Sequence, residues 1–149
     1  MPKVDLSTIE KVQRTGYPPP HDQQVRGRSS QRLGPIFGLT DFGASVTTLE
    51  PGAWSSQRHW HDGEDELVVM LEGEAVLVED EGETLLRAGD VAVFPKGVRN
   101  GHHLINRSDE PCRLIAVGKQ LTAVCHYSDI DMIVDPAHGG YTHRDGTPF

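Results

Sequence analysis

Two histidines and a glutamate stand close together near the middle of the chain, within the stretch Arg58-His-Trp-His-Asp-Gly-Glu-Asp-Glu66. His59 and His61 are two residues apart, so on a β-strand both side chains point to the same face. Glu66 follows after four residues, and Gly63 among them allows a short turn that returns the chain beside itself. The two imidazoles and the carboxylate would then meet at one point.

Two histidines and one carboxylate form a ligand set that suits Fe(II) and is also open to Mn, Ni or Zn. We therefore predict a divalent metal site at His59, His61 and Glu66. The alternative is a surface hairpin that carries two solvated histidines. A metal site requires further strands, because other elements must bring the ligands together and shield them from solvent.

The segments on both sides of this stretch have the pattern of short β-strands. From Ala44 onward, strand-like runs of a few residues follow one another, and Gly and Pro mark the turns between them. The expected strands are residues 45–50, 66–71, 75–79, 83–87, 91–94, 102–106, 112–118 and 121–127. No convincing amphipathic helix interrupts them. Evenly spaced strands joined by tight turns indicate an all-β antiparallel sandwich or barrel.

The strand expected at residues 66–71 is apolar on both faces. Glu66 shares its face with Val68 and Met70. The opposite face carries an apolar row of three residues: Leu67, Val69 and Leu71. Both faces must therefore be covered, one by the barrel interior and the other by another sheet, the N-terminal arm or a partner subunit. We expect a homodimer, because a two-fold isologous pair is the commonest closed assembly.

The chain is expected to divide into three segments. Residues 1–43 form an N-terminal arm that packs on the barrel, residues 44–127 form the barrel, and residues 128–149 form a C-terminal tail over its surface. The arm contains Tyr17-Pro-Pro-Pro20, which is incompatible with a helix or a central strand. One turn of helix is expected near residues 7–12.

Length and charge limit the class of protein. The chain has 149 residues, a length that fits one domain with a hydrophobic core. Its formal net charge is -8. The basic residues form only a mixed patch at Arg26, Arg28 and Arg32, so no nucleic-acid or membrane partner is expected. No apolar stretch has transmembrane length, and the N-terminus lacks a signal-peptide core. We expect a cytoplasmic protein in which Cys112 and Cys125 are reduced core residues.

Two motifs in this sequence resemble those of the cupin superfamily. The first family motif is G(x)5HxH(x)4E(x)6G, and one extra residue here precedes the first histidine. Its matching residues are Gly52, His59, His61, Glu66 and Gly73. The second is G(x)5PxG(x)2H(x)3N, whose second half resumes two residues late because Asn100 occupies the histidine position. Its matching residues are Gly89, Pro95, Gly97, His102 and Asn106.

The resemblance implies a jelly roll, the antiparallel double-stranded β-helix of the cupin barrel. It also implies a divalent metal inside the barrel, held by the first-motif ligands and a histidine of the second motif. His102 is the expected fourth ligand, because it keeps the spacing to Asn106 and would share an inward face with Leu104. His103 would face outward and is the alternative. A site with neither histidine is the third option.

Segments outside the motifs resemble a group of small single-domain bacterial cupins that are usually called sugar-phosphate-isomerase-like. The similar segments are Leu33-Gly34, Gly38–Gly43, Arg58–His61, Gly101–Asn106 and Tyr141–Gly146. The resemblance to this group implies a small-molecule substrate such as a sugar or a sugar phosphate.

Three functions are compatible with these residues. The first is a metal-dependent isomerase, epimerase or lyase that acts on a small polar, oxygen-rich metabolite. The second is an Fe(II)-dependent dioxygenase, and the third is a non-enzymatic sensor or binding protein that uses the metal to hold a ligand. Metal identity separates the first two functions, and turnover separates an enzyme from a binding protein.

Two further residues are candidates for substrate binding. Arg99 lies in a loop expected near the metal, and Tyr127 could close the mouth of the barrel. Trp60 stands between the two histidine ligands and is expected to point away from them as a packing residue. Glu64 and Asp65 lie in the turn before Glu66, where carboxylates are usually solvated.

Overall fold

Antiparallel β-strands make up most of the regular structure in the computed structural model, which describes residues 3–119 and 122–149. The strands are β1 (Arg28–Arg32), β2 (Gly43–Leu49), β3 (His59–His61), β4 (Glu66–Glu72), β5 (Glu74–Glu79), β6 (Gly82–Arg87), β7 (Val91–Phe94), β8 (His103–Ile105), β9 (Cys112–Gly118), β10 (Cys125–Tyr127), β11 (Ile133–Asp135) and β12 (Gly140–Thr142). Helical structure is limited to a 3₁₀ turn, η1 (Leu6–Thr8), and a short helix, α1 (Leu33–Phe37).

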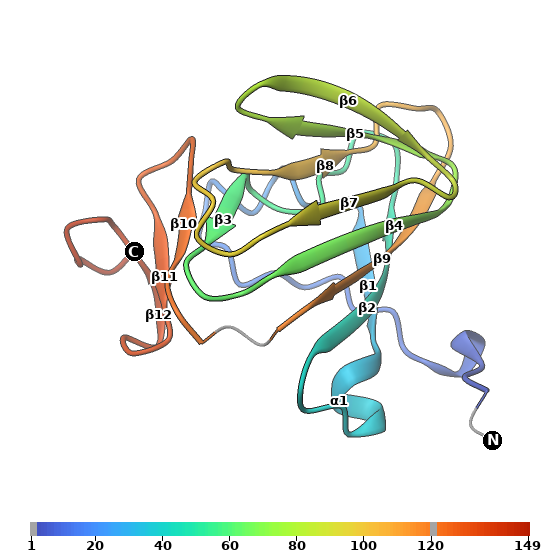
Figure 1. Ribbon diagram of the computed structural model, residues 1–149, viewed down its shortest axis with the longest axis horizontal. Coiled ribbons are helices and arrows are strands. Elements are labelled where there is room, and N and C mark those ends of the chain that lie inside the picture. The colour runs from blue at the N-terminus through green and yellow to red at the C-terminus, as the bar shows by residue number, and fades with distance from the viewer. Residues whose placement is uncertain (1–2, 120–121) are drawn as a thin grey trace.

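The strands form three sheets (Figure 1). A five-stranded sheet has the order β1-β2-β9-β4-β7, and a three-stranded sheet has the order β6-β5-β8. The main hydrophobic core combines side chains from both, such as Met70 and Leu114 of the first with Leu77 and Leu104 of the second. A third sheet, β12-β11-β10-β3, lies at one end of the barrel. The predicted all-β antiparallel jelly roll is therefore confirmed.

Most of the strands expected after residue 44 are present, within a few residues of their expected bounds. The strand expected at residues 121–127 begins only at Cys125, and residue 121 lies outside the described residues. The helical turn expected near residues 7–12 occurs as η1, slightly earlier. Alternating apolar residues thus located the core strands well, because these strands bury one face against the opposite sheet.

The arm and the tail contribute strands that the sequence did not reveal. β1 pairs with β2 from Arg28 opposite Leu49 to Arg32 opposite Ser45. Its sequence, Arg-Ser-Ser-Gln-Arg, contains no apolar residue, so hydrophobic alternation could not show it. In the tail, β11 and β12 extend the third sheet beyond β10. These strands have three residues each, which is too short for a clear period.

The outer face of the five-stranded sheet is covered over only part of its width. Near β1 and β2, the Gln31 amide donates to the backbone oxygens of Leu6 and Ile9, and Val46 is buried there. Near β4 and β7, Val91 and Val93 are 58% and 64% exposed, beside the apolar row predicted on β4. The chain's own arm thus covers one half of this face, and the homodimer remains a prediction for the other half. No helix among the described residues is long and apolar enough to cross a membrane.

Candidate metal centre

Two strands, β3 and β4, and the residue that precedes β8 bring the predicted metal ligands together. β3 carries His59 and His61 on one face. The backbones of His59 and His102 form an antiparallel bridge, with N–H to O distances of 3.2 and 2.9 Å. Glu66 begins β4 after a turn that passes very close to the chain before β10, because a Cβ on Gly63 would lie 2.7 Å from the Cβ of Ala123.

The three imidazoles converge on one oxygen of Glu66. The distances from Nε2 to Glu66 Oε2 are 3.6 Å for His59, 3.2 Å for His61 and 3.1 Å for His102. A bound ion with ligand distances of about 2.1 Å would separate neighbouring ligand atoms by about 3 Å. Neither ring nitrogen of His61 makes a hydrogen bond within the described residues, although both are buried. Donor atoms of His59, Glu66 and His102 lie within 4.8 Å of one another and fit a divalent ion, and His61 adjoins this group at Glu66.

Electrostatics favour a charged Glu66 and a neutral His102, which are the protonation states that a metal requires of these two groups. Burial raises the pKa of Glu66, but the hydrogen bond with His102 and the adjacent imidazoles of His59 and His61 outweigh burial and hold that pKa far below its usual range. Burial also lowers the pKa of His102. A charged carboxylate beside a neutral imidazole is the state in which both groups bind a cation. The ring of Phe94 stacks on His102 at 3.6 Å and fixes its orientation.

Glu64 is a functional candidate that sequence reasoning missed. It was expected to be solvated, but its side chain is 1% exposed. Oε1 accepts hydrogen bonds from the Thr122 and Ala123 backbones and from the Thr122 hydroxyl. Oε2 lies 3.4 Å from Nδ1 of His61. The tight turn that returns Glu66 to the site thus also directs Glu64 inward, and burial of this turn was not visible from its polar sequence.

Cys125 and Tyr127 lie beside the histidines of β3. In the register of β3 and β10, Cys125 is opposite His61 and Tyr127 is opposite His59. Donor atoms of Cys125, His59 and His61 lie within 4.8 Å of one another, so a buried thiol adjoins the centre. The Tyr127 ring lies 6.0 Å from that of His59 and packs against Tyr17 at 5.6 Å. Tyr127 is therefore buried in an aromatic cluster rather than in the cavity wall.

His103 and Arg99 lie away from the converging ligands. The His103 ring packs on Trp54 at 4.5 Å, and its Nδ1 lies 3.0 Å from the backbone oxygen of Ser56. The exposed Arg99 guanidinium lies 5.7 Å from the ring of Trp60, which stacks on His126. Trp60 thus packs as predicted, and Arg99 accompanies it instead of lining the cavity.

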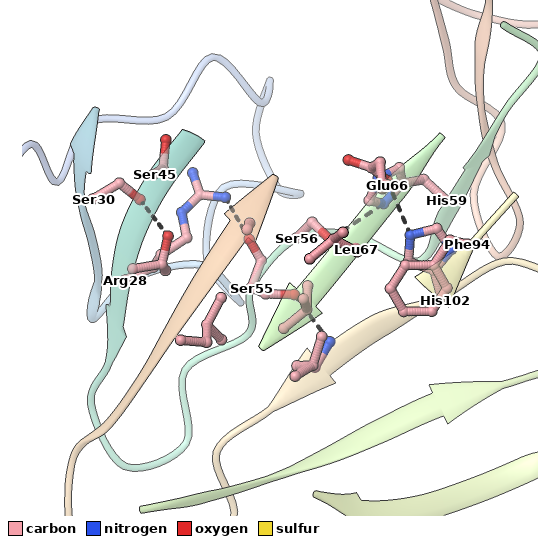
Figure 2. A pocket seen from close by; sticks show the side chains of 15 residues that line it. Arg28, Ser30, Ser45, Ser55, Ser56, His59, Glu66, Leu67, Phe94 and His102 are labelled. Carbon is pink, nitrogen blue, oxygen red and sulfur yellow. Dashed lines mark hydrogen bonds and ion pairs between the residues drawn. The ribbon is translucent and has the colours of Figure 1, made fainter. Parts of the chain in front are cut away.

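A cavity of about 250 Å³ extends from the metal centre into the barrel. Figure 2 shows His59, Glu66 and His102 on one side of it and Arg28 with Ser30 and Ser45 on the other. The remaining polar groups in its wall are Thr47, Ser55 and Ser56. Sequence reasoning missed this polar side, because it belongs to β1, β2 and a loop that carry no recognisable motif.

Comparisons with known proteins agree with this fold and site. Residues 45–118 match the Cupin_2 family, described as Cupin domain. A cupin-superfamily sugar phosphate isomerase from Silicibacter pomeroyi is 43% identical, with a TM-score of 0.92 over 99% of this chain and 96% of that one. The chain belongs to the cupin superfamily.

Two more distant structures are also similar. A sugar phosphate isomerase from Acidithiobacillus ferrooxidans, itself described as putative, is 26% identical, with a TM-score of 0.71 over 77% of this chain and 74% of that one. A Cupin 2 conserved barrel domain protein from Salinispora arenicola is 24% identical, with a TM-score of 0.57 over 80% of this chain and 87% of that one, and supports the fold alone. A search of curated proteins gave no match.

Proposed function

We propose that the protein is a metal-dependent enzyme that isomerises, epimerises or eliminates from a small oxygen-rich metabolite, such as a sugar or a sugar phosphate. The observation that carries this proposal is the convergence of His59, His61 and His102 on one oxygen of Glu66 at the wall of a cavity. Two similar structures bear the name sugar phosphate isomerase, which supports the substrate class.

The lining of the cavity suits a polyhydroxylated molecule. A divalent ion held by these side chains would supply a Lewis acid for a carbonyl or hydroxyl group. The serine and threonine hydroxyls opposite can each donate and accept hydrogen bonds. Apolar residues such as Val68 and Leu114 form the wall between the two ends. The substrate would therefore be oriented by hydroxyl contacts along a cavity that is polar at both ends.

The cavity wall offers few groups that can act as a catalytic base. Among the described residues that line the cavity, Glu66 is the one carboxylate, and its proposed role is to hold the metal. Ser56 Oγ lies 3.2 Å from Nδ1 of His59, so this histidine contacts a hydroxyl of the cavity wall.

Metal analysis and turnover test the proposal together. The anaerobically purified protein is expected to contain manganese, nickel or zinc, and to turn over at least one member of a panel of sugars, sugar phosphates and keto acids. Glu66→Gln should abolish turnover and lower the metal content. Asp65→Asn is the matched control, because Asp65 is exposed and lies outside the cavity wall.

The two other functions correspond to different outcomes. Iron in the purified protein, together with O2 uptake on addition of a substrate, would replace the proposal with an Fe(II) dioxygenase. Saturable metal-dependent binding without turnover across the panel would instead identify a sensor or binding protein.

A further inference from the structure

Three arginines gather at the end of the cavity away from the metal centre. Arg28 and Arg32 belong to β1, and Arg14 belongs to the arm that runs beside it. Together they line a second cavity of about 500 Å³. Arg28, Ser30 and Ser45 belong to the walls of both cavities, so the two adjoin. The arginines thus surround an opening that continues toward the metal centre.

The strand geometry explains why part of the basic patch faces inward. Alternate residues of β1 share a face, so Arg28, Ser30 and Arg32 lie on the inner side with Ser45 of β2. Arg26 precedes the strand and pairs with Asp22 on the surface. The sequence patch therefore divides into one ordinary surface arginine and two arginines that line the opening.

The charge around this opening is exceptional for the chain, which has 22 acidic and 14 basic residues. Among the residues that the structure describes, no Asp or Glu lines the second cavity. In the described residues, Arg14, Arg28 and Arg32 have no carboxylate partner within 4.0 Å, whereas five other arginines do: Arg26, Arg58, Arg87, Arg107 and Arg113. Uncompensated like charges that line a concave site raise the local concentration of an oppositely charged ligand.

Arg28 is held in place by a backbone contact. Its Nη1 donates a hydrogen bond of 2.6 Å to the backbone oxygen of Ser55, which fixes the plane of the guanidinium. A guanidinium has five N–H donors in a planar fork that matches phosphate and carboxylate oxygens. The hydroxyls of Ser30 and Ser45 lie in the same wall and can donate to the same anion.

We propose that Arg28, with Arg14 and Arg32, binds the phosphate group of a phosphorylated substrate whose other end reaches the metal centre. A phosphate monoester carries a charge of about -2 at neutral pH and has three acceptor oxygens. A ligand with a phosphate group therefore matches three arginines better than a ligand with one carboxylate group. The position of the substrate's other end rests on the proposed function. The anion site itself rests only on the arginines.

Calorimetric titration of the full-length purified protein with inorganic phosphate tests the site, with a chelator-treated sample as a second arm. Phosphate is expected to bind in both arms, and Arg28→Gln should weaken it about 10-fold or more, the usual loss for a hydrogen bond to a charged group. Arg26→Gln removes the same charge two residues away and should leave binding unchanged. Equal phosphate affinity in the two variants would overturn the proposal.

Further arms separate the ligand classes and guard against misfolding. Acetate that competes as well as phosphate would overturn the phosphate assignment. Arg32→Gln, at the exposed mouth, should also weaken phosphate binding, so the proposal stays testable if Arg28→Gln does not fold. No loss of affinity in Arg32→Gln would then count against it.

The anion site and the proposed enzyme can fail separately. Arg28-dependent phosphate binding without turnover on any sugar phosphate would leave the anion site and remove the enzyme proposal. Turnover that is equal for a sugar and its phosphate, and insensitive to Arg28→Gln, would leave the enzyme and remove the anion site.

Discussion

The two ends of the barrel cavity differ in how their polar groups are paired. At the metal end, the polar groups contact one another: three imidazoles converge on Glu66, and Phe94 stacks on His102. At the arginine end, Arg28 has one hydrogen bond to a backbone oxygen, and the arginines have no carboxylate partner in the described residues. One end thus suits a cation and the other an anion. The difference explains how a single cavity could orient a polar substrate.

Removing a ligand from the metal end should have the largest effect. We predict that His102→Ala lowers metal affinity about 10-fold or more. Loss of a residue that only hydrogen-bonds to a metal ligand typically lowers metal affinity about 10–100-fold, and loss of a ligand should cost at least as much. His103→Ala is the matched control, because His103 packs on Trp54 and should leave metal affinity nearly unchanged. Metal titration of both variants provides the measurement. Reversed effects would mean that the strand is shifted by one residue.

Glu64→Gln should lower metal affinity about 10-fold, because it alters the tautomer of His61. The amide oxygen can face either the Thr122 and Ala123 N–H groups or His61, but not both. If it stays with the N–H groups, the amide NH2 faces Nδ1 of His61. The ring proton then moves to Nε2, which is the nitrogen that faces Glu66.

The same metal titration measures this second effect. Asp65→Asn, in the same turn but exposed, is its control and should retain wild-type affinity. Unchanged metal affinity in Glu64→Gln would mean that Glu64 only anchors the Thr122–Ala123 backbone.

The two ends should also respond differently to pH. Protons compete with a metal for imidazole nitrogens, so metal affinity should fall as the pH drops through about 6.5. Burial lowers the pKa of His61, but Cys125 and Glu66 outweigh it and raise that pKa, so metal affinity should continue to rise above pH 6.5. Arginines keep their charge over this range.

Sulfate binding at the arginine end can be compared with metal binding over the same pH range, because sulfate stays fully ionised over this range. Its affinity for this end should be nearly flat between pH 5 and about 8, where the arginines stay protonated. Metal affinity that is flat over the same interval would contradict imidazole ligation.

A substitution on the outer face of β4 and β7 should have the smallest effect on metal and anion binding. If a homodimer buries this face, Val93→Glu should reduce the mass in light scattering from twice the 16.4 kDa chain mass to the chain mass. Metal affinity should be nearly unchanged, because Val93 faces away from Glu66. Leu85→Glu, which changes an exposed residue of β6, is the control. A wild-type protein that is already monomeric would reject the dimer.

The sequence by itself determined the fold class and the group of residues at the metal end. Period-two alternation and turn residues indicated the core strands, because these strands bury one face. His59, His61 and Glu66 converge because their spacing combines one strand face with one tight turn. The same alternation favoured His102 over His103, and the structure places only His102 against Glu66.

Only the tertiary structure decided what lies around that group. Glu64, Cys125 and the arginine end depend on register between segments far apart in the chain, such as β10 beside β3 and β1 beside β2. The inner face of β1 lines a polar cavity, and on its outer face the Gln31 amide donates to the backbone of the arm. β1 therefore has no apolar residue, and its sequence resembles a loop. Local sequence specifies which face of a strand a residue occupies. What that face meets is specified by the packing of the other sheets.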